Sequence, residues 1–176
     1  MKVHQIRTFS DFHDCIQRYD QNYTVFRGVR DATYKLVPKI GRPDTKLKGR
    51  IDKVERRMLQ IFSDRAVPHL RVLPRNDWEW LALMQHHGVP TRLIDWSRNA
   101  LVAAYFAVEK ESATGSAVYA WRDKERPINA AKDDGPFSIK DVRKFIPAHV
   151  SERIIAQSGL FTVHPSPAVP MESETL

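Results

Sequence analysis

Cysteine is almost absent from this chain of 176 residues, which contains Cys15 and no other. A single cysteine excludes a disulfide within the chain and any zinc site built from several thiolates. Phe12, Ile16 and Tyr19 surround Cys15 in an apolar pattern, which predicts a small core residue rather than a reactive thiol. This cysteine usage is typical of a reducing compartment, so we expect a cytoplasmic protein.

Long apolar runs and glycine-rich motifs are missing as well. No run reaches the roughly 18 residues of a membrane helix, and no apolar stretch follows the first charges, so we expect neither a membrane span nor a signal peptide. The seven glycines stand singly, which excludes phosphate-binding loops of the GxxxxGK[ST] and GxGxxG types and a GxSxG elbow. His86 and His87 are adjacent and no HExxH spacing occurs, so no metal site is expected.

Positive charge is abundant and unevenly distributed. The net charge is +7, and in residues 41–75 ten basic residues less four acidic ones leave +6. Such a segment attracts polyanions, which predicts a nucleic-acid-binding surface. An equally simple interpretation is a solvated helix face that keeps the protein in solution. The candidate nucleic-acid contacts are Arg42, Lys46, Lys48, Arg50, Arg56 and Arg57.

Periodicity and capping residues predict four helices in the first 110 residues. The first begins at Ser10, and the second covers residues 51–65. Asn76, followed three residues later by Glu79, caps a third helix that ends at Gly88. A loop is expected over residues 89–95. The fourth helix runs from Asn99 to about residue 110 and is almost entirely apolar, which predicts burial on all sides.

Strands are predicted at residues 23–26, ended by Gly28, and at 117–121, 142–146 and 160–164, with a short helix from Ser151 between the last two. Because these elements do not alternate regularly as βαβ units, we expect an α+β fold in which helices pack on a small, mostly antiparallel sheet. The length suits a single domain over residues 1–164. The proline-rich sequence from Pro165 onward predicts a flexible tail over residues 165–176.

Three ordered motifs are specific enough to indicate a family. The first is Phe26-Arg27-Gly28, and the second runs from Gln85 to Trp96 (QHHGVPTRLIDW) and continues into the helix of residues 101–107. The third covers residues 153–162 (RIIAQSGLFT), with His164 after it. In these motifs, from about residue 20 to about residue 165, the chain resembles the FRG domain family.

The order of the motifs is also similar, more weakly, to that of ADP-ribosyltransferases, and this similarity implies an NAD pocket with an ADP-ribosyltransferase-like fold. It implies that Arg27 binds NAD and that Thr91 or Ser97 supplies a hydroxyl. Gln157 stands where the family has a catalytic Glu, and Glu152 lies five residues earlier. The implied catalytic set is therefore Arg27, Glu152 and Gln157. The implied NAD-binding set is Arg27, Gly28, Gln85, His86, Thr91, Arg92 and Tyr105. Family associations imply a role in bacterial or phage conflict.

The residues themselves leave alternatives open. Arg27, at a strand end beside a glycine, suits a phosphate or carboxylate clamp or a salt bridge to Asp95. Glu152 suits a general base or a charge that complements a helix dipole. His164 is a candidate replacement for the missing acid. We therefore expect an NAD-using transferase, a nucleic-acid-binding or processing module, or a ligand-sensing domain without catalysis.

Overall fold

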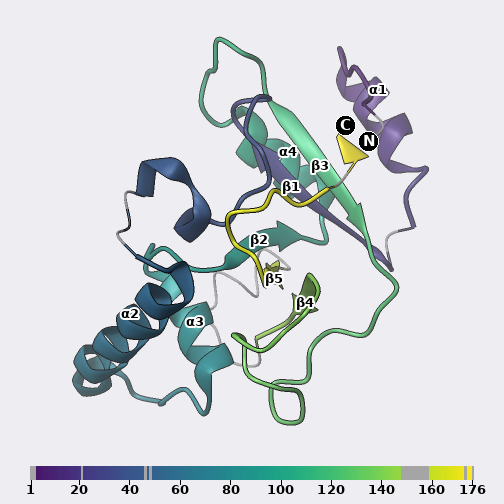
Figure 1. Cartoon of the computed structure of the whole chain (residues 1–176). Coiled ribbons are helices and arrows are strands. Elements are labelled where there is room, and N and C mark those ends of the chain that lie inside the picture. The colour runs from purple at the N-terminus through teal and green to yellow at the C-terminus, as the bar shows by residue number, and fades with distance from the viewer. Residues whose placement is uncertain are drawn as a thin grey trace.

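A computed structural model describes residues 3–20, 22–45, 47, 49–147, 159–172 and 174–175 (Figure 1). Within them, four α-helices pack on a six-stranded sheet in which all neighbouring strands are antiparallel. This confirms the predicted α+β class. The helices are α1 (Phe9–Ile16), α2 (Ile51–Ala66), α3 (Asp77–His86) and α4 (Ala100–Val108). The strands are β1 (Thr24–Val29), β2 (Leu93–Ser97), β3 (Ala117–Arg122), β4 (Arg143–Phe145), β5 (Gly159–Val163) and β6 (Glu174–Thr175). No helix in the described ranges is long and apolar enough to cross a bilayer.

The sheet consists of two well-paired halves that meet at one residue pair. Its strand order is β4-β5-β2-β1-β3-β6. Six residue pairs join β1 to β3, and five join β2 to β5. Between the halves, β1 and β2 are joined only by Phe26 opposite Ser97. Figure 1 shows β2 running at an angle to β1, so the two central strands separate beyond this pair.

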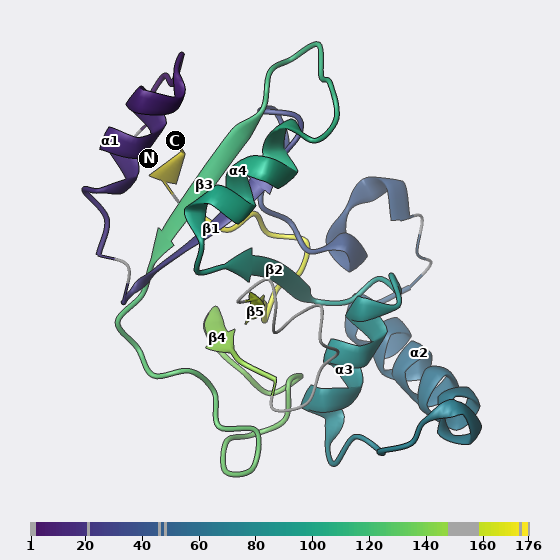
Figure 2. The ribbon, with the colours of Figure 1, turned by 180° about the vertical axis from the view of Figure 1, so that it is seen from behind.

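Helix α4 covers β1 and β3, and the view from behind shows it lying directly over them (Figure 2). Its buried residues are Ala100, Ala103 and Ala107, whose small side chains allow a close approach to the sheet. Gly28 makes that approach possible, because a Cβ there would lie only 1.8 Å from the carbonyl oxygen of Ala103. The prediction that Gly28 ends the strand was wrong, since β1 continues to Val29.

Burial of the fourth helix on all sides was also predicted wrongly. Leu101, Tyr105 and Val108 of α4 remain 48%, 61% and 68% exposed. The alanines recur at helical spacing and bring one side of the helix onto β1, which leaves these larger residues on the side facing solvent. Apolar composition alone therefore overstated how much of this helix the fold covers.

Two apolar cores hold the helices to the sheet. Phe12, Cys15 and Ile16 of α1 pack with Phe26 and the alanines of α4, so the prediction for Cys15 is confirmed. The second core joins α2 and α3 to the other half of the sheet. Its buried members are Leu59, Trp78, Leu81, Ala82, Met84, Leu93, Ile128, Phe145, Phe161 and Val163.

The structure also decides several local predictions. Asn76 caps α3 by accepting a hydrogen bond from the Glu79 backbone N–H at 3.1 Å, as predicted. The prediction of a loop over residues 89–95 was wrong for residues 93–95, because β2 begins at Leu93 at the centre of the sheet. The short helix predicted from Ser151 lies outside the described residues.

The segment after Pro165 lies along the body of the protein where the structure describes it. The backbone N–H of Met171 donates to the carbonyl of Leu36 at 2.9 Å, and β6 pairs with β3. Gly41 packs so closely on Pro167 that a Cβ would lie 1.8 Å from its carbonyl oxygen. The flexibility of this segment and the boundary at residue 164 stay predictions.

Candidate functional site

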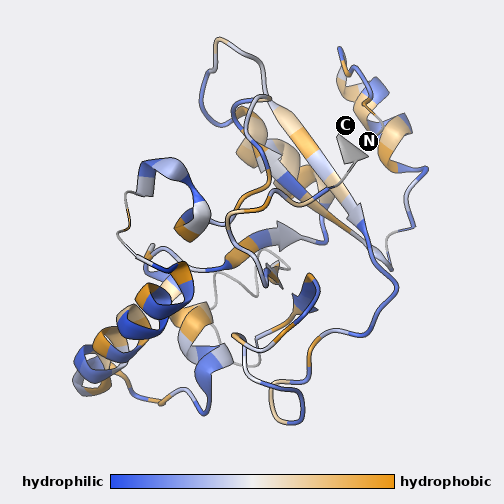
Figure 3. Ribbon diagram, in the orientation of Figure 1, coloured by the Kyte–Doolittle hydropathy of each residue, from blue (hydrophilic) through white to orange (hydrophobic). Residues whose placement is uncertain are grey.

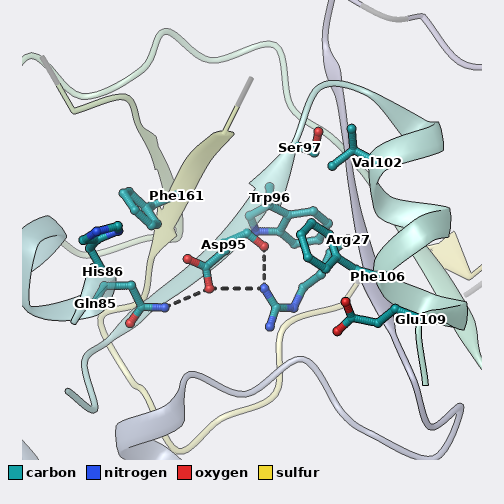
Figure 4. A pocket seen from close by; sticks show the side chains of 11 residues that line it. Arg27, Gln85, His86, Asp95, Trp96, Ser97, Val102, Phe106, Glu109 and Phe161 are labelled. Atoms are coloured by element: carbon teal, nitrogen blue, oxygen red, sulfur yellow. Dashed lines mark hydrogen bonds and ion pairs between the residues drawn. The ribbon is translucent and has the colours of Figure 1, made fainter. Parts of the chain in front are cut away.

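A pocket of about 440 Å³ opens beside the junction of β1 and β2. Small-molecule sites commonly range from about 300 to 1,000 Å³, so this volume suits a ligand. Five elements supply its walls, namely β1, α3, β2, α4 and β5, with Glu109 directly after α4 (Figure 4). The lining residues are Arg27, Gly28, Gln85, His86, Asp95, Trp96, Ser97, Val102, Phe106, Glu109 and Phe161.

Arg27 extends from β1 into this pocket. Its Nη1 donates to the backbone oxygen of Asp95 at 2.6 Å and lies 3.5 Å from the carboxylate Oδ2 of the same residue. Within the described parts of the chain, its Nε and Nη2 donate to no protein group. The side chain is 22% exposed and lines the pocket, where its guanidinium lies between Asp95 and Glu109 (Figure 4).

Burial lowers the pKa of Arg27, and the neighbouring Asp95 carboxylate opposes this effect. Arginine is not deprotonated in proteins, so the guanidinium stays charged at neutral pH. The two alternatives for Arg27, an anion clamp and a salt bridge to Asp95, are therefore compatible with each other. One edge of the guanidinium forms the ion pair with Asp95, and the other remains available as an anion clamp.

A chain of hydrogen bonds fixes the polar side of the pocket. The buried hydroxyl of Thr91 donates to Oε1 of Gln85 at 2.6 Å, and Nε2 of Gln85 donates to Oδ2 of Asp95 at 2.9 Å. Oδ2 thus lies between Gln85 and Arg27, as Figure 4 shows. Because the Thr91 hydroxyl determines which way the Gln85 amide is oriented, Thr91 acts as a positioning residue behind the pocket.

Aromatic side chains form the apolar walls. Trp96, Phe106 and Phe161 all line the pocket. The indole N–H of Trp96 donates to the buried hydroxyl of Thr162 at 2.9 Å, which anchors that ring from behind. The pocket therefore combines one guanidinium and two carboxylates with flat apolar surfaces, an arrangement suited to a ligand with charged groups and a ring.

The sequence-predicted residues divide into those in the pocket and those outside it. The structure brings Arg27, Gly28, Gln85 and His86 together as lining residues. Tyr105 is exposed on α4 and is absent from the lining. Two further candidates, Glu152 and Gln157, lie outside the described residues.

Arg92 was predicted to bind the nucleotide, but the structure places it in the core. It bonds Glu55 at 2.8 Å and Asp52 at 2.6 Å, and its guanidinium lies 4.5 Å from the centre of the Phe137 ring. Burial raises the pKa of Glu55, and the Arg92 charge counteracts that shift. A buried carboxylate requires such a partner, so Arg92 joins α2 to the start of β2.

His164, the candidate replacement acid, is also buried away from the pocket lining. Its Nε2 shares a 2.9 Å hydrogen bond with the Thr162 hydroxyl. Burial, with smaller contributions from the charges of Arg27 and Arg92, lowers its pKa to about 4. The imidazole is therefore neutral at pH 7 and cannot serve as a general acid there.

Glu109 and the aromatic walls are pocket residues that sequence reasoning missed. Val102 and Phe106 of α4 and Glu109 directly after it are spaced at i, i+4 and i+7, and all three line the pocket. That spacing is visible in the sequence and indicates a common face. The prediction of an entirely buried helix drew attention away from it.

The family model for the FRG domain matches residues 22–116, more than half of the chain. The chain belongs to the FRG domain family. The match includes Arg27, the Gln85–Asp95 stretch and Glu109, all of which contribute to the pocket. No curated protein and no solved structure matches the chain.

The structure gives each residue of the FRG signature a separate role. Phe26 is buried in the core beneath α4. Arg27 faces the pocket, and Gly28 allows α4 to lie against the strand. The signature therefore couples the packing of one helix to the placement of one guanidinium.

Proposed function

We propose that the FRG pocket binds NAD and that the protein is an ADP-ribosyltransferase-like enzyme. The observation that carries the proposal is the state of Arg27. Its guanidinium is mostly buried and fixed by Asp95, while no protein group in the described ranges accepts a hydrogen bond from Nε or Nη2. Two adjacent donors of this kind match the oxygens of a phosphate group.

The charges of the pocket favour NAD over an entirely anionic nucleotide. Arg27 offers a cation for the pyrophosphate, whereas Asp95 and Glu109 add two carboxylates. The oxidised nicotinamide ring is positively charged and flat, so it suits a carboxylate beside aromatic walls. Figure 4 shows Arg27 with Asp95 on one side and Glu109 on the other.

Transfer from NAD requires the bond between the ribose anomeric carbon and the nicotinamide nitrogen to break. The bonding electron pair leaves with nicotinamide, which becomes neutral, and positive charge develops on the anomeric carbon. A nearby carboxylate stabilises that charge. An acceptor then forms the new bond to carbon and loses its proton to solvent or to a carboxylate. Glu109 is the pocket carboxylate that we assign to this stabilising role, alongside the candidates Glu152 and Gln157.

Binding is tested by thermal shift with NAD. We expect NAD to raise the melting temperature of the wild type and to have no effect on Arg27→Ala, because the clamp is removed. Arg30→Ala is the matched control, since Arg30 is an exposed arginine directly after β1, and it should respond like the wild type. Equal stabilisation of Arg27→Ala and the wild type would contradict the assignment.

Catalysis is tested separately by released nicotinamide. The wild type should liberate nicotinamide from NAD. Glu109→Gln should still bind NAD but should release nicotinamide at least about 100-fold more slowly. Binding without any release by the wild type would identify a ligand-sensing domain and refute the enzymatic part of the proposal.

A further inference from the structure

The start of α2 presents a cluster of positive side chains, here called the basic face, made of Arg50, Lys53, Arg56 and Arg57. All four are exposed. Arg50, Lys53 and Arg57 are spaced at i, i+3 and i+7 and so share one side of the helix. In the described parts of the chain, none of the four forms a salt bridge with a carboxylate. Figure 3 shows α2 as a largely hydrophilic helix with apolar residues interspersed.

The acids of the same helix turns pair with the buried Arg92, although only Glu55 is itself buried and Asp52 stays 52% exposed. Asp52 and Glu55 both bond to Arg92, at 2.6 Å and 2.8 Å. The four cations of the basic face and Arg92 carry five positive charges, and Asp52 and Glu55 carry two negative charges. The net charge of these seven side chains is +3. Arg92 thus pairs with both carboxylates, and the exposed cations of the basic face remain in excess.

Two of the cations lie where they do not favour the helix. Arg50 is the N-cap residue of α2 but makes no side-chain capping bond, and Lys53 is in the first turn. Positive charge at a helix N-terminus opposes the macrodipole and is unfavourable for the helix. The dipole itself also attracts anions to this end. Arg50 and Lys53 therefore do not stabilise this helix end, where Asp52 is the acidic residue of the first turn.

We propose that the basic face binds the phosphate backbone of double-stranded nucleic acid. Phosphate contacts from lysine and arginine supply sequence-independent affinity. Binding to single strands relies on exposed aromatic side chains that stack on bases, and the described residues of α2 expose no large aromatic side chain. The basic face is separate from the NAD pocket in its residues, so either proposal can fail without the other.

Three of the six residues that the sequence analysis named as candidate nucleic-acid contacts belong to this face, namely Arg50, Arg56 and Arg57. Arg42 is only partly exposed and donates through Nε to the carbonyl of Val37 at 3.0 Å. Lys46 and Lys48 lie outside the described residues. Arg56 also stacks over the Phe137 ring, 4.1 Å from its centre, which fixes its position on the face.

Fluorescence anisotropy with a labelled 20-base-pair DNA duplex of arbitrary sequence tests the proposal. We compare the wild type with the triple variant Arg50→Ala/Lys53→Ala/Arg57→Ala from 50 to 200 mM salt. Removal of three phosphate contacts should reduce the slope of log K against log salt by about 2.7, because each contact contributes about 0.9. At 100 mM salt, affinity should fall at least tenfold.

The matched control is Arg7→Ala/Arg18→Ala/Lys110→Ala, which removes the same charge at exposed positions outside α2. It should retain the wild-type slope. An equal change in both triple variants, or no measurable binding by the wild type, would overturn the proposal. Equal or tighter binding of a single-stranded oligonucleotide would overturn the duplex assignment. Thermal melting of each variant verifies that it is folded.

Discussion

Replacement of Gly28 by alanine tests how the family signature couples helix packing to the pocket. The new Cβ would lie 1.8 Å from the carbonyl oxygen of Ala103 and 2.7 Å from the backbone nitrogen of Ala107. To reach even the lower limit of 3.0 Å from that oxygen, α4 and β1 must separate by at least about 1.2 Å. Extra atoms in a packed core typically cost about 1–3 kcal/mol. Because both obstacles are backbone atoms, we expect a loss of about 3 kcal/mol or more.

The assay is urea denaturation of Gly28→Ala beside Gly135→Ala. A Cβ at Gly135 meets no atom within 4 Å, so the control should keep its stability or gain about 0.5 kcal/mol. We also expect Gly28→Ala to lose the response to NAD, since Arg27 and part of α4 both line the pocket. A destabilisation below about 1 kcal/mol would refute the packing argument.

Three further predictions follow from buried polar groups. The folded-state pKa of His164 is lowered to about 4, so wild-type stability should fall by about 3 kcal/mol as pH decreases from 6.5 to 4. Denaturation across this range should show a smaller fall for His164→Gln, and parallel curves would contradict the assignment. Arg92→Met should lower the free energy of unfolding by about 3–5 kcal/mol at pH 7, because Glu55 loses its buried partner. Adding Glu55→Gln should recover part of that loss, whereas a loss under about 1 kcal/mol for Arg92→Met alone would contradict the need for a partner. Thr91→Val should weaken NAD binding while Thr91→Ser preserves it, and equal affinities measured by calorimetry would remove Thr91 from the positioning chain.

Local chemistry made some elements predictable. The cap of α3 could be identified because Asn76 and its backbone partner at Glu79 lie within one turn. The helix at residues 51–65 was recognisable from its apolar spacing, and α2 covers it. Of the two alternatives for Arg27, the ion pair with Asp95 is present in the structure, and the residue also lines a pocket. In each case the determining residues form short, specific patterns.

Features that depend on distant partners were less accessible. The strand character of β2 depends on pairing with β5, more than 60 residues later. Arg92 resembles a ligand-binding arginine until Glu55, 37 residues earlier, is placed beside it. Composition also did not reveal which side of α4 is covered, because that depends on how closely Gly28 lets the helix approach.

A crystal structure of the protein with a non-hydrolysable NAD analogue tests the central claim most directly. The account predicts a phosphate oxygen within hydrogen-bonding distance of Nε or Nη2 of Arg27. It also predicts the nicotinamide ring near Glu109 and the aromatic walls. An analogue bound elsewhere, with Nε and Nη2 of Arg27 making no contact to it, would contradict the account.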